Sequence, residues 1–449
     1  MNYTLAIIGG GPAGYTAAEK AAKKGLSVVL FEKNSIGGVC LNCGCIPTKT
    51  LLYSAKLFDH SRNGDKYGIS ASDVSFSLDK IMSRKNKIIR KLSAGIKARL
   101  KSAGVTVVNE HAHIESVSNG LFILKTDNEQ YEVSKIILAT GSEPSVPPIN
   151  GIENVDYWTS TDALQIKSIP ERIIIVGGGV IGMEFASFFN SMGSKVTVVE
   201  MLPEILGNMD KEISQMLRED FQKRGIEFYL NTKVTSFADP KTVCIENEDG
   251  IKNLSFDNIL IASGRRSVID KSFVDVLNLE FDNRRLKVND KMQTSYPNVY
   301  ACGDITGKMM LAHVAEREAM AAVNNILGND DLMRFNAVPG VVYTSPEVAS
   351  VGYTEEELIK SNICFGISKL PMTYAGRFVV ENETVQGLCK ILFDKNDKIL
   401  GVHILGNQSS EFIASAGMAI QFGISKEEWS KTIFPHPTVS EILKEAINE

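Results

Sequence analysis

The chain has 449 residues, which corresponds to about three domains at roughly 150 residues each. Its 44% hydrophobic and 22% charged residues are typical of folded globular proteins and exclude a fibrous or disordered chain. With 48 basic and 53 acidic residues the net charge is −5, so no overall positive field favours nucleic acid or an anionic membrane as partner.

The sequence shows no targeting segment, and its cysteines are unevenly distributed. No basic segment precedes the first apolar stretch, and no run of about 18 apolar residues occurs, so neither a signal peptide nor a membrane span is expected and the protein is predicted to be cytoplasmic. Seven cysteines, an odd number, argue against a structural disulfide framework. Three of them, Cys40, Cys43 and Cys45, are close in sequence and need another explanation.

One pattern occurs twice. Residues 5–8 form an apolar strand that leads into Gly9-x-Gly11-x-x-Gly14, a helix over 15–24 and a strand over 27–31 that ends at Glu32. Residues 172–176 lead in the same way into Gly177-x-Gly179-x-x-Gly182, a helix to about 192 and a strand over 195–199 that ends at Glu200. The same offset relates every glycine and the acid, which predicts two dinucleotide-binding βαβ units.

Each residue type in this pattern has a physical role. The first glycine allows a tight turn, the second lets the backbone approach a pyrophosphate, and the third lets helix and strand pack closely. The acid accepts hydrogen bonds from ribose hydroxyls. A carboxylate at Glu200 repels a 2′-phosphate, and no arginine lies between Glu200 and Asp210 to bind one, so the second unit is predicted to take NAD rather than NADP.

A family resemblance follows from the cysteine segment. Residues 37–50, Gly-Gly-Val-Cys-Leu-Asn-Cys-Gly-Cys-Ile-Pro-Thr-Lys-Thr, closely resemble the redox-active segment of the FAD-dependent pyridine nucleotide disulfide reductases. Further segments match the family in order along nearly the whole chain, at 139–141, 262–266, 300–304, 311–316, 343–352 and 436–441. The resemblance implies an α/β fold with two Rossmann-like dinucleotide-binding domains and a C-terminal α+β dimerisation domain, and hence a homodimer.

Chain order then gives the expected domains. They are an FAD-binding domain over 1–148, an NAD-binding domain over 149–265, a central segment over 266–330 that completes the FAD domain, and an interface domain over 335–449.

The resemblance implies that Cys40 and Cys45 form a disulfide that exchanges electrons with the flavin. In a regular helix they would lie about 7.5 Å apart, beyond the roughly 7 Å Cα limit for a disulfide, so the pair must span an irregular helix start. Three buried cysteines, or half of a zinc site, are the alternatives, but no second ligand pair exists, so no metal is expected. Cys43 departs from the family's apolar residue; it either competes for pairing or packs as a small hydrophobe.

The resemblance also implies the cofactor contacts. Lys49 is expected to pair with Glu184 beside the flavin. The expected FAD contacts are Gly9, Gly11, Gly14, Glu32, Ala112, Gly141, Asp304 and Ala312. The expected NAD contacts are Gly177, Gly179, Gly182, Glu200, Val234, Gly264 and Arg265.

His436 and Glu441 complete the expected site. Histidine has the unperturbed pKa nearest neutrality, and Glu441 could orient one ring nitrogen while the other takes a proton from a thiol. A histidine in a Phe-Pro-His-Pro turn is more often structural, and the match to the family's HPTxSE pattern reverses that interpretation. In the family this histidine reaches the disulfide of the other subunit.

Within the family, the sequences of segments 311–316 and 436–441 are most similar to those of the dihydrolipoamide dehydrogenases. The expected reaction is oxidation of protein-bound dihydrolipoamide with reduction of NAD⁺, and the expected partner is a lipoyl-bearing protein of a 2-oxoacid dehydrogenase or glycine cleavage complex. The alternatives are a related reductase acting on another disulfide, an NADH diaphorase or oxidase, and a non-enzymatic FAD-bearing scaffold.

A basic amphipathic helix is predicted over 78–103. Apolar residues at 81, 88, 92, 96 and 100 mark one face. A solvated surface is the favoured interpretation of the other face, with docking of an acidic domain as the alternative. Its basic residues are Lys80, Arg84, Lys85, Lys87, Arg90, Lys91, Lys97, Arg99 and Lys101.

Overall fold

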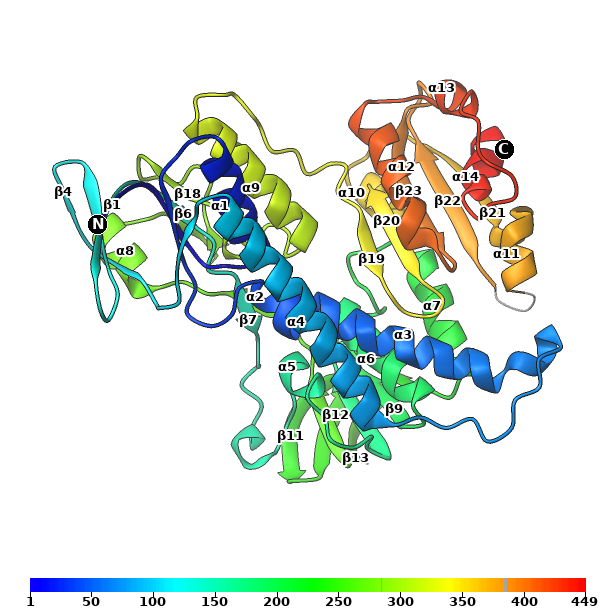
Figure 1. Ribbon diagram of the computed structural model, residues 1–449. Helices are drawn as coiled ribbons and strands as arrows, with labels where there is room; N and C mark the ends of the chain where they lie inside the picture. The colour runs from blue at the N-terminus through cyan, green and yellow to red at the C-terminus, as the bar shows by residue number, and fades with distance from the viewer. Residues whose placement is uncertain (284, 383–385) are drawn as a thin grey trace. The chain divides into compact units, whose positions relative to one another are not determined.

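The computed structural model describes residues 1–283, 285–382 and 386–449, and Figure 1 shows its helices and strands. It divides into two compact units. Unit 1 comprises Met1–Thr50, Asp79–Ser145 and Arg265–Arg334. Unit 2 comprises Leu51–Leu78, Val146–Gly264 and Phe335–Glu449.

Unit 1 is built on a sheet with a parallel core. The strand order is β3-β2-β1-β6-β5-β4, and β18 pairs in parallel with the end of β6. The last four residues of β1 are buried without alternation, as expected for a parallel strand covered on both faces. The strands are β1 (Asn2–Ile8), β2 (Val28–Phe31), β3 (Thr106–Val108), β4 (His113–Ser118), β5 (Leu121–Lys125), β6 (Gln130–Leu138) and β18 (Val299–Ala301).

Helices α1 (Pro12–Lys23) and α9 (Ala312–Ile326) pack side by side in unit 1, although they lie far apart in sequence (Figure 1). Both helices bury several alanines, among them Ala17 and Ala21 of α1 and Ala322 of α9, and such small side chains allow helix backbones to approach closely. A third helix, α4 (Leu78–Ser102), agrees with the predicted amphipathic helix to within one residue. Two short strands, β7 (Ser142–Pro144) and β15 (Arg265–Ser267), form an antiparallel pair.

Unit 2 contains the second predicted βαβ pattern. A parallel sheet has the order β10-β9-β8-β14, and a three-stranded antiparallel sheet has the order β11-β12-β13. Helix α6 (Val180–Ser191) follows β8, and α7 (Lys211–Lys223) precedes β10. The strands are β8 (Arg172–Val176), β9 (Lys195–Val199), β10 (Glu227–Tyr229), β11 (Lys233–Asp239), β12 (Thr242–Asn247), β13 (Gly250–Ser255) and β14 (Asn258–Ile261).

The C-terminal part of unit 2 is an antiparallel sheet of order β19-β20-β23-β22-β21. Alternate residues of its strands form an apolar core with α12 (Ser409–Gln421) and α14 (Glu441–Asn448), which gives the predicted α+β pattern. The mixed α/β fold class is therefore confirmed. The strands are β19 (Gly340–Val342), β20 (Val348–Gly352), β21 (Gly366–Pro371), β22 (Leu388–Phe393) and β23 (Ile399–Leu405).

The other face of this sheet carries a buried ionic cluster. Lys390 on β22 is 1% exposed and its Nζ lies 3.0 Å from Asp210 Oδ2 and 3.2 Å from Glu212 Oε2, with Glu355 as a third partner. These carboxylates raise the pKa of Lys390 against the effect of burial, so the ammonium stays charged. Asp210 also caps α7 by accepting from Ile213 N–H, so the cluster joins α7 to the C-terminal sheet.

Across the described residues, no helix combines the length and the apolar character needed to cross a membrane.

Glu318 on α9 gives a stability prediction for unit 1. Its side chain is fully buried; Oε2 accepts a 2.6 Å hydrogen bond from Gly303 N–H, while Oε1 has no hydrogen-bond partner among the described residues. Burial raises the pKa of Glu318 to about 7, with nearby Asp304 adding to the effect and Lys308 opposing it. The folded state therefore binds a proton more tightly than the unfolded state does, and stability falls as pH rises from about 4.5 through 7.

We expect Glu318→Gln to remove this component, because an amide keeps the Gly303 hydrogen bond without a charge. Between pH 5 and pH 8 the unfolding free energy of the variant should fall by up to about 3 kcal/mol less than that of the unmodified protein. Urea unfolding at both pH values measures it, with the exposed Glu153→Gln as control. An unchanged pH dependence in Glu318→Gln would contradict the prediction.

Candidate active site

The first glycine turn joins β1 to α1 in unit 1. A Cβ on Gly14 would lie 1.8 Å from the carbonyl oxygen of Gly9, so only glycine lets the helix start this close to the strand end. Gly9 itself has φ +109°, a conformation that favours glycine. Helix α1 begins at Pro12, and no described side chain caps its N-terminus at Gly11. Its first N–H groups are therefore suited to bind a pyrophosphate.

The second glycine turn, in unit 2, has the same geometry. A Cβ on Gly182 would lie 2.0 Å from Gly177 O, and Gly177 again has φ +109°. A Cβ on Gly179 would meet no described atom within 4 Å, so this glycine faces open space at the uncapped N-terminus of α6. Packing therefore requires the first and third glycines, while the second keeps the phosphate position open.

The two acids that end β2 and β9 also take equivalent positions. Glu32 accepts 2.7 Å hydrogen bonds from Gly10 N–H and Asn34 N–H. Glu200 accepts from Gly178 N–H at 2.5 Å and from Leu202 N–H at 2.7 Å.

Both side chains are less than 10% exposed, so the turn fixes each carboxylate before any ligand arrives. Each oxygen keeps a second lone pair for a ribose hydroxyl. The residues present thus fit one dinucleotide at each turn, and the binding of FAD in unit 1 and of NAD in unit 2 stays a prediction.

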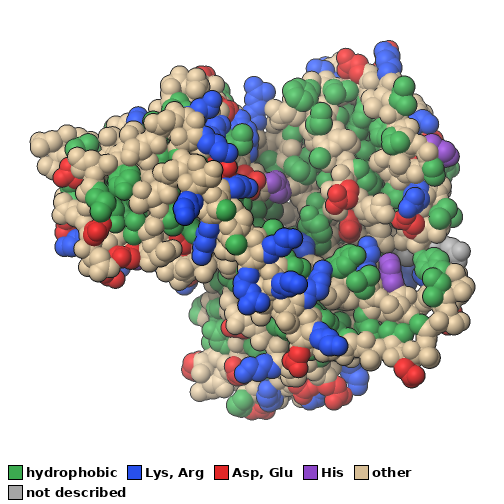
Figure 2. All heavy atoms as spheres, viewed as in Figure 1, with side chains coloured by type: hydrophobic (Ala, Val, Ile, Leu, Met, Phe, Trp, Pro, Cys, Tyr) green, Lys and Arg blue, Asp and Glu red, His purple; other side chains and the backbone are tan. Residues whose placement is uncertain are grey.

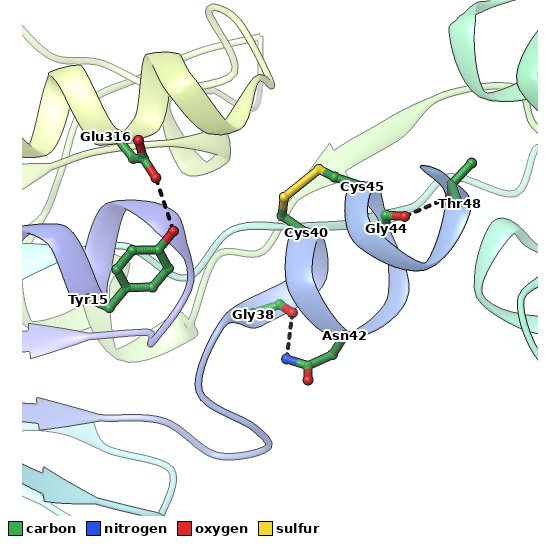
Figure 3. Close-up of a disulfide and its surroundings, with 8 residues drawn as sticks. All are labelled: Tyr15, Gly38, Cys40, Asn42, Gly44, Cys45, Thr48 and Glu316. Carbon is green, nitrogen blue, oxygen red and sulfur yellow. Dashed lines mark hydrogen bonds between the residues drawn. A yellow bond between two sulfur atoms is a disulfide. The ribbon is translucent and has the colours of Figure 1, made fainter. Parts of the chain in front are cut away.

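The redox segment shows why five residues can separate two bonded cysteines. Cys40 lies in α2 (Gly38–Cys43), and Cys45 is the first residue of α3 (Cys45–Arg62). Gly44 breaks the helix with φ −148° and ψ −112°, which brings the Cα atoms of Cys40 and Cys45 to 4.6 Å in the disulfide (Figure 3). The predicted irregular helix start is confirmed. A Cβ on Gly44 would lie 3.0 Å from Val39 O, so a small residue is needed at the break.

Side chains around the disulfide hold the segment in place. The Asn42 amide donates a 2.9 Å hydrogen bond to Gly38 O and also reaches the carbonyl groups of Ser35 and Ile36 (Figure 3). The Thr48 hydroxyl donates to Gly44 O at 2.6 Å. Asn42 was not among the predicted residues, although its place inside the cysteine segment was a signal for it.

Cys43 lies outside the disulfide and is partly exposed, so it does not pack as a fully buried hydrophobe. It lies near enough to the Arg265 guanidinium to interact electrostatically.

Asp304 belongs to a network that the sequence did not predict. The Ser142 hydroxyl donates to Asp304 Oδ2, while Arg265 donates from Nε to Ser142 Oγ and from Nη2 to Ser142 O, both at 2.8 Å. Burial lowers the pKa of Arg265, with the Asp304 carboxylate opposing that effect. Arg265 is thus joined to Asp304 through Ser142 within unit 1, and its contact with NAD stays a prediction. Ser142 follows the matched segment 139–141 directly, which was the available signal.

Another pair in unit 1 extends from α1 to α9. The Tyr15 hydroxyl donates a 3.0 Å hydrogen bond to Glu316 Oε1 (Figure 3), and burial together with this carboxylate raises the pKa of Tyr15.

The remaining predicted contacts lie on defined elements. Gly141 and Gly264 have φ +76° and +123°, Ala112 is buried after β3, and Ala312 is the first residue of α9. Val234 on β11 packs in the core formed with β14.

The pairing of Lys49 with Glu184 stays a prediction, because the two residues belong to different units. Within unit 2, Glu184 accepts a 3.1 Å hydrogen bond from Tyr343 N–H and is 3% exposed.

His436 and Glu441 form the predicted pair in unit 2. His436 Nδ1 lies 3.0 Å from Glu441 Oε1, and Thr438 N–H donates a 2.8 Å hydrogen bond to Glu441 Oε2. The Thr438 hydrogen bond, followed by that of His436, lowers the pKa of Glu441. The histidine side chain is 79% exposed, so Nε2 faces away from the protein core while the ionised carboxylate orients Nδ1.

Comparison with known proteins decides the family. The family described as pyridine nucleotide-disulphide oxidoreductase matches residues 3–319, and its dimerisation domain matches residues 338–447. The chain belongs to the pyridine nucleotide-disulphide oxidoreductase family. It is an enzyme that uses FAD and NAD(H), and the dimerisation domain supports a homodimer.

Relatives cover almost the whole chain. A dihydrolipoyl dehydrogenase of Mycoplasma pneumoniae is 37% identical, covering 99% of this chain and 97% of its own. The mitochondrial dihydrolipoyl dehydrogenase of Homo sapiens is 38% identical, covering 98% and 89%. Among solved structures, the HOCl-induced flavoprotein disulfide reductase RclA of Escherichia coli has a TM-score of 0.87 at 29% identity and covers 99% of each chain.

Gly182, which packs tightly, and Gly179, which faces open space, should respond differently to substitution by alanine. Gly182→Ala should lower the melting temperature, because its Cβ would overlap Gly177 O. Gly179→Ala should leave stability nearly unchanged and raise the KM for NAD⁺ at least about tenfold, because its Cβ would occupy the open phosphate position. Thermal melting and steady-state kinetics measure both effects; equal losses of stability in the two variants would contradict the assignment.

Proposed function

We propose that this flavin disulfide oxidoreductase oxidises dihydrolipoamide to lipoamide and reduces NAD⁺. The observation that carries the proposal is the Cys40–Cys45 disulfide at the start of α3, in a chain matched over nearly its full length by dihydrolipoyl dehydrogenases. FAD supplies the two-electron relay between this disulfide and NAD⁺ when both cofactors are bound. A lipoyl-bearing protein of a multienzyme complex is the proposed natural partner, and a cytoplasmic location stays a prediction.

The protein's own thiols perform the exchange. A lipoyl thiolate attacks Cys40 Sγ, the Cys40–Cys45 bond breaks, and Cys45 leaves as a thiolate. The second lipoyl thiolate then attacks the lipoyl sulfur of the mixed disulfide, which closes the lipoyl ring and releases Cys40. The substrate loses two electrons and two protons, and the protein disulfide gains the two electrons.

The position of Cys45 suits it to leave. It is the first residue of α3, an 18-residue helix, and a helix N-terminus stabilises a nearby thiolate.

The His436–Glu441 pair is proposed to take the substrate proton. With Glu441 ionised and bound to Nδ1, the exposed Nε2 is the nitrogen that can accept a thiol proton. In the homodimer each pair is proposed to serve the disulfide of the other chain.

A second candidate is reduction of another disulfide by NADH, which the likeness to the disulfide reductase RclA favours. Formation of NADH from dihydrolipoamide and NAD⁺ would favour the first candidate, and its absence would favour the second.

The cysteine roles are tested by serine substitution. Cys40→Ser and Cys45→Ser should each abolish NADH formation from dihydrolipoamide while FAD stays bound, since the FAD turn lies at Gly9–Gly14 and not at the disulfide. The exposed Cys364→Ser is the matched control and should keep full activity. In the unmodified protein, anaerobic dihydrolipoamide should make both Cys40 and Cys45 reactive to iodoacetamide. Retained activity in either serine variant would refute the exchange scheme.

The role of His436 has a separate test. His436→Ala should slow oxidation of dihydrolipoamide by about 100-fold or more, because general-base catalysis is lost, while NADH oxidation by artificial acceptors is retained. Glu441→Gln should also slow oxidation of dihydrolipoamide, because the carboxylate that orients His436 Nδ1 is lost. Equal losses in both reactions would argue against His436 as the base.

A further inference from the structure

The solvent-facing side of α4 carries a group of positive charges that the reaction above does not use. Figure 2 shows Lys and Arg side chains gathered over this helix. Five of them are exposed and form no ion pair within the described part of the chain, and they are called the α4 basic face: Lys87, Arg90, Lys91, Lys97 and Lys101. Successive members are three, one, six and four residues apart, which at 3.6 residues per turn places all five within about a third of the helix circumference.

The structure narrows the predicted basic surface. Lys85 is 5% exposed, and burial lowers its pKa, so it does not belong to this face. Arg99 donates from Nε to Glu19 Oε2 at 2.9 Å and is thus neutralised within unit 1. The α4 basic face is therefore a continuous row of positive charges without ion-pair partners among the described residues.

Lys101 lies in the last turn of α4, where a positive charge stabilises the helix end, but the other four charges do not serve the helix itself. Like charges three or four residues apart, such as Lys87 with Arg90 and Lys91, destabilise a helix by about 0.2–0.5 kcal/mol per pair. Gly95 in the same helix adds a cost of about 0.5–1 kcal/mol relative to alanine, although a Cβ there would meet no described atom within 4 Å. The sequence therefore keeps a charged and flat surface at the expense of helix stability.

The small side chains between the charges indicate the kind of partner. Ala94, Gly95 and Ala98 are exposed among the basic residues. The face offers no aromatic platform for stacking bases. Of the large apolar side chains of α4, whose residues are all described, Leu92 is exposed at 42%, and one such side chain is too little to anchor the helix in a membrane. A flat cationic stripe matches the carboxylates of an acidic protein surface, which approach it without steric hindrance.

We propose that the α4 basic face docks an acidic protein domain that presents the dihydrolipoyl group. The inference rests on the proposed function and names the partner surface for it. Complementary charge steers the carrier domain to unit 1, where the Cys40–Cys45 disulfide lies, and raises the association rate at low ionic strength.

The test compares two reduced substrates: a purified lipoylated lipoyl domain of strongly negative net charge, and free dihydrolipoamide, which is uncharged. The variant carries Lys87→Glu, Arg90→Glu and Lys91→Glu. The matched control carries Lys223→Glu, Lys360→Glu and Lys395→Glu, three exposed lysines of unit 2 that give the same change in net charge.

At low ionic strength the α4 variant should lose at least about tenfold in kcat/KM for the acidic domain, and the control less than about twofold. Both should oxidise free dihydrolipoamide at the rate of the unmodified protein. Added salt should lower the rate of the unmodified protein toward that of the α4 variant, because the Debye length falls from about 30 Å at 0.01 M to about 8 Å at 0.15 M.

Equal losses in the variant and the control, or no loss in either, would overturn the proposal. So would binding of phosphatidylglycerol vesicles or single-stranded RNA through the α4 basic face with unchanged turnover of the domain. If the unmodified protein fails to oxidise free dihydrolipoamide, the proposed function fails, and calorimetric binding of the acidic domain to protein and variants still decides the docking surface. If the triple variant melts early, Lys97→Gln with Lys101→Gln replaces it.

Discussion

Both predicted nucleotide sites depend on one close contact. In each Gly-x-Gly-x-x-Gly turn, the third glycine lies against the carbonyl oxygen of the first glycine. At Gly14 and at Gly182 a single added carbon would overlap that oxygen. The contact fixes where α1 and α6 start and therefore where their unpaired N–H groups point. Glu32 and Glu200 accept hydrogen bonds from the backbone N–H groups of Gly10 and Gly178, which lie within the same turns. The turn suited to phosphate and the acid suited to ribose are therefore held together in one rigid structure.

The redox chemistry depends on a different local constraint, a broken helix. Gly44 ends α2 and lets α3 begin at once, so a cysteine from each helix meets in one disulfide. The arrangement makes the two sulfurs unequal, because only Cys45 starts a long helix whose N-terminus stabilises a thiolate. The C-terminal pair shows the same asymmetry, since Glu441 is held by Thr438 N–H and only one nitrogen of His436 remains exposed to act.

Sequence reasoning recovered those features that depend on neighbours in the chain. The two glycine patterns, the helix start between Cys40 and Cys45 and the amphipathic helix near α4 are local and leave periodic or spaced signals. It could not predict partners that meet through tertiary packing. Arg265 lies on a strand that pairs with β7, so it binds Ser142 beside Asp304, and Lys85 turned out to be buried although its helix is basic. The Lys390 cluster likewise joins residues of three distant segments, and no spacing in the sequence marks it.

The interrupted course of unit 1 along the chain has a consequence for synthesis. Strand β6 and helix α1 are translated early, but their partners β18 and α9 emerge only after the residues 146–264 of unit 2 have left the ribosome. A nascent chain at that stage has an unpaired strand edge and an uncovered alanine-rich helix face, both of which favour aggregation. The growing polypeptide is therefore prone to aggregation until α9 docks, and truncations before Ile326 leave α1 of unit 1 without its packing partner.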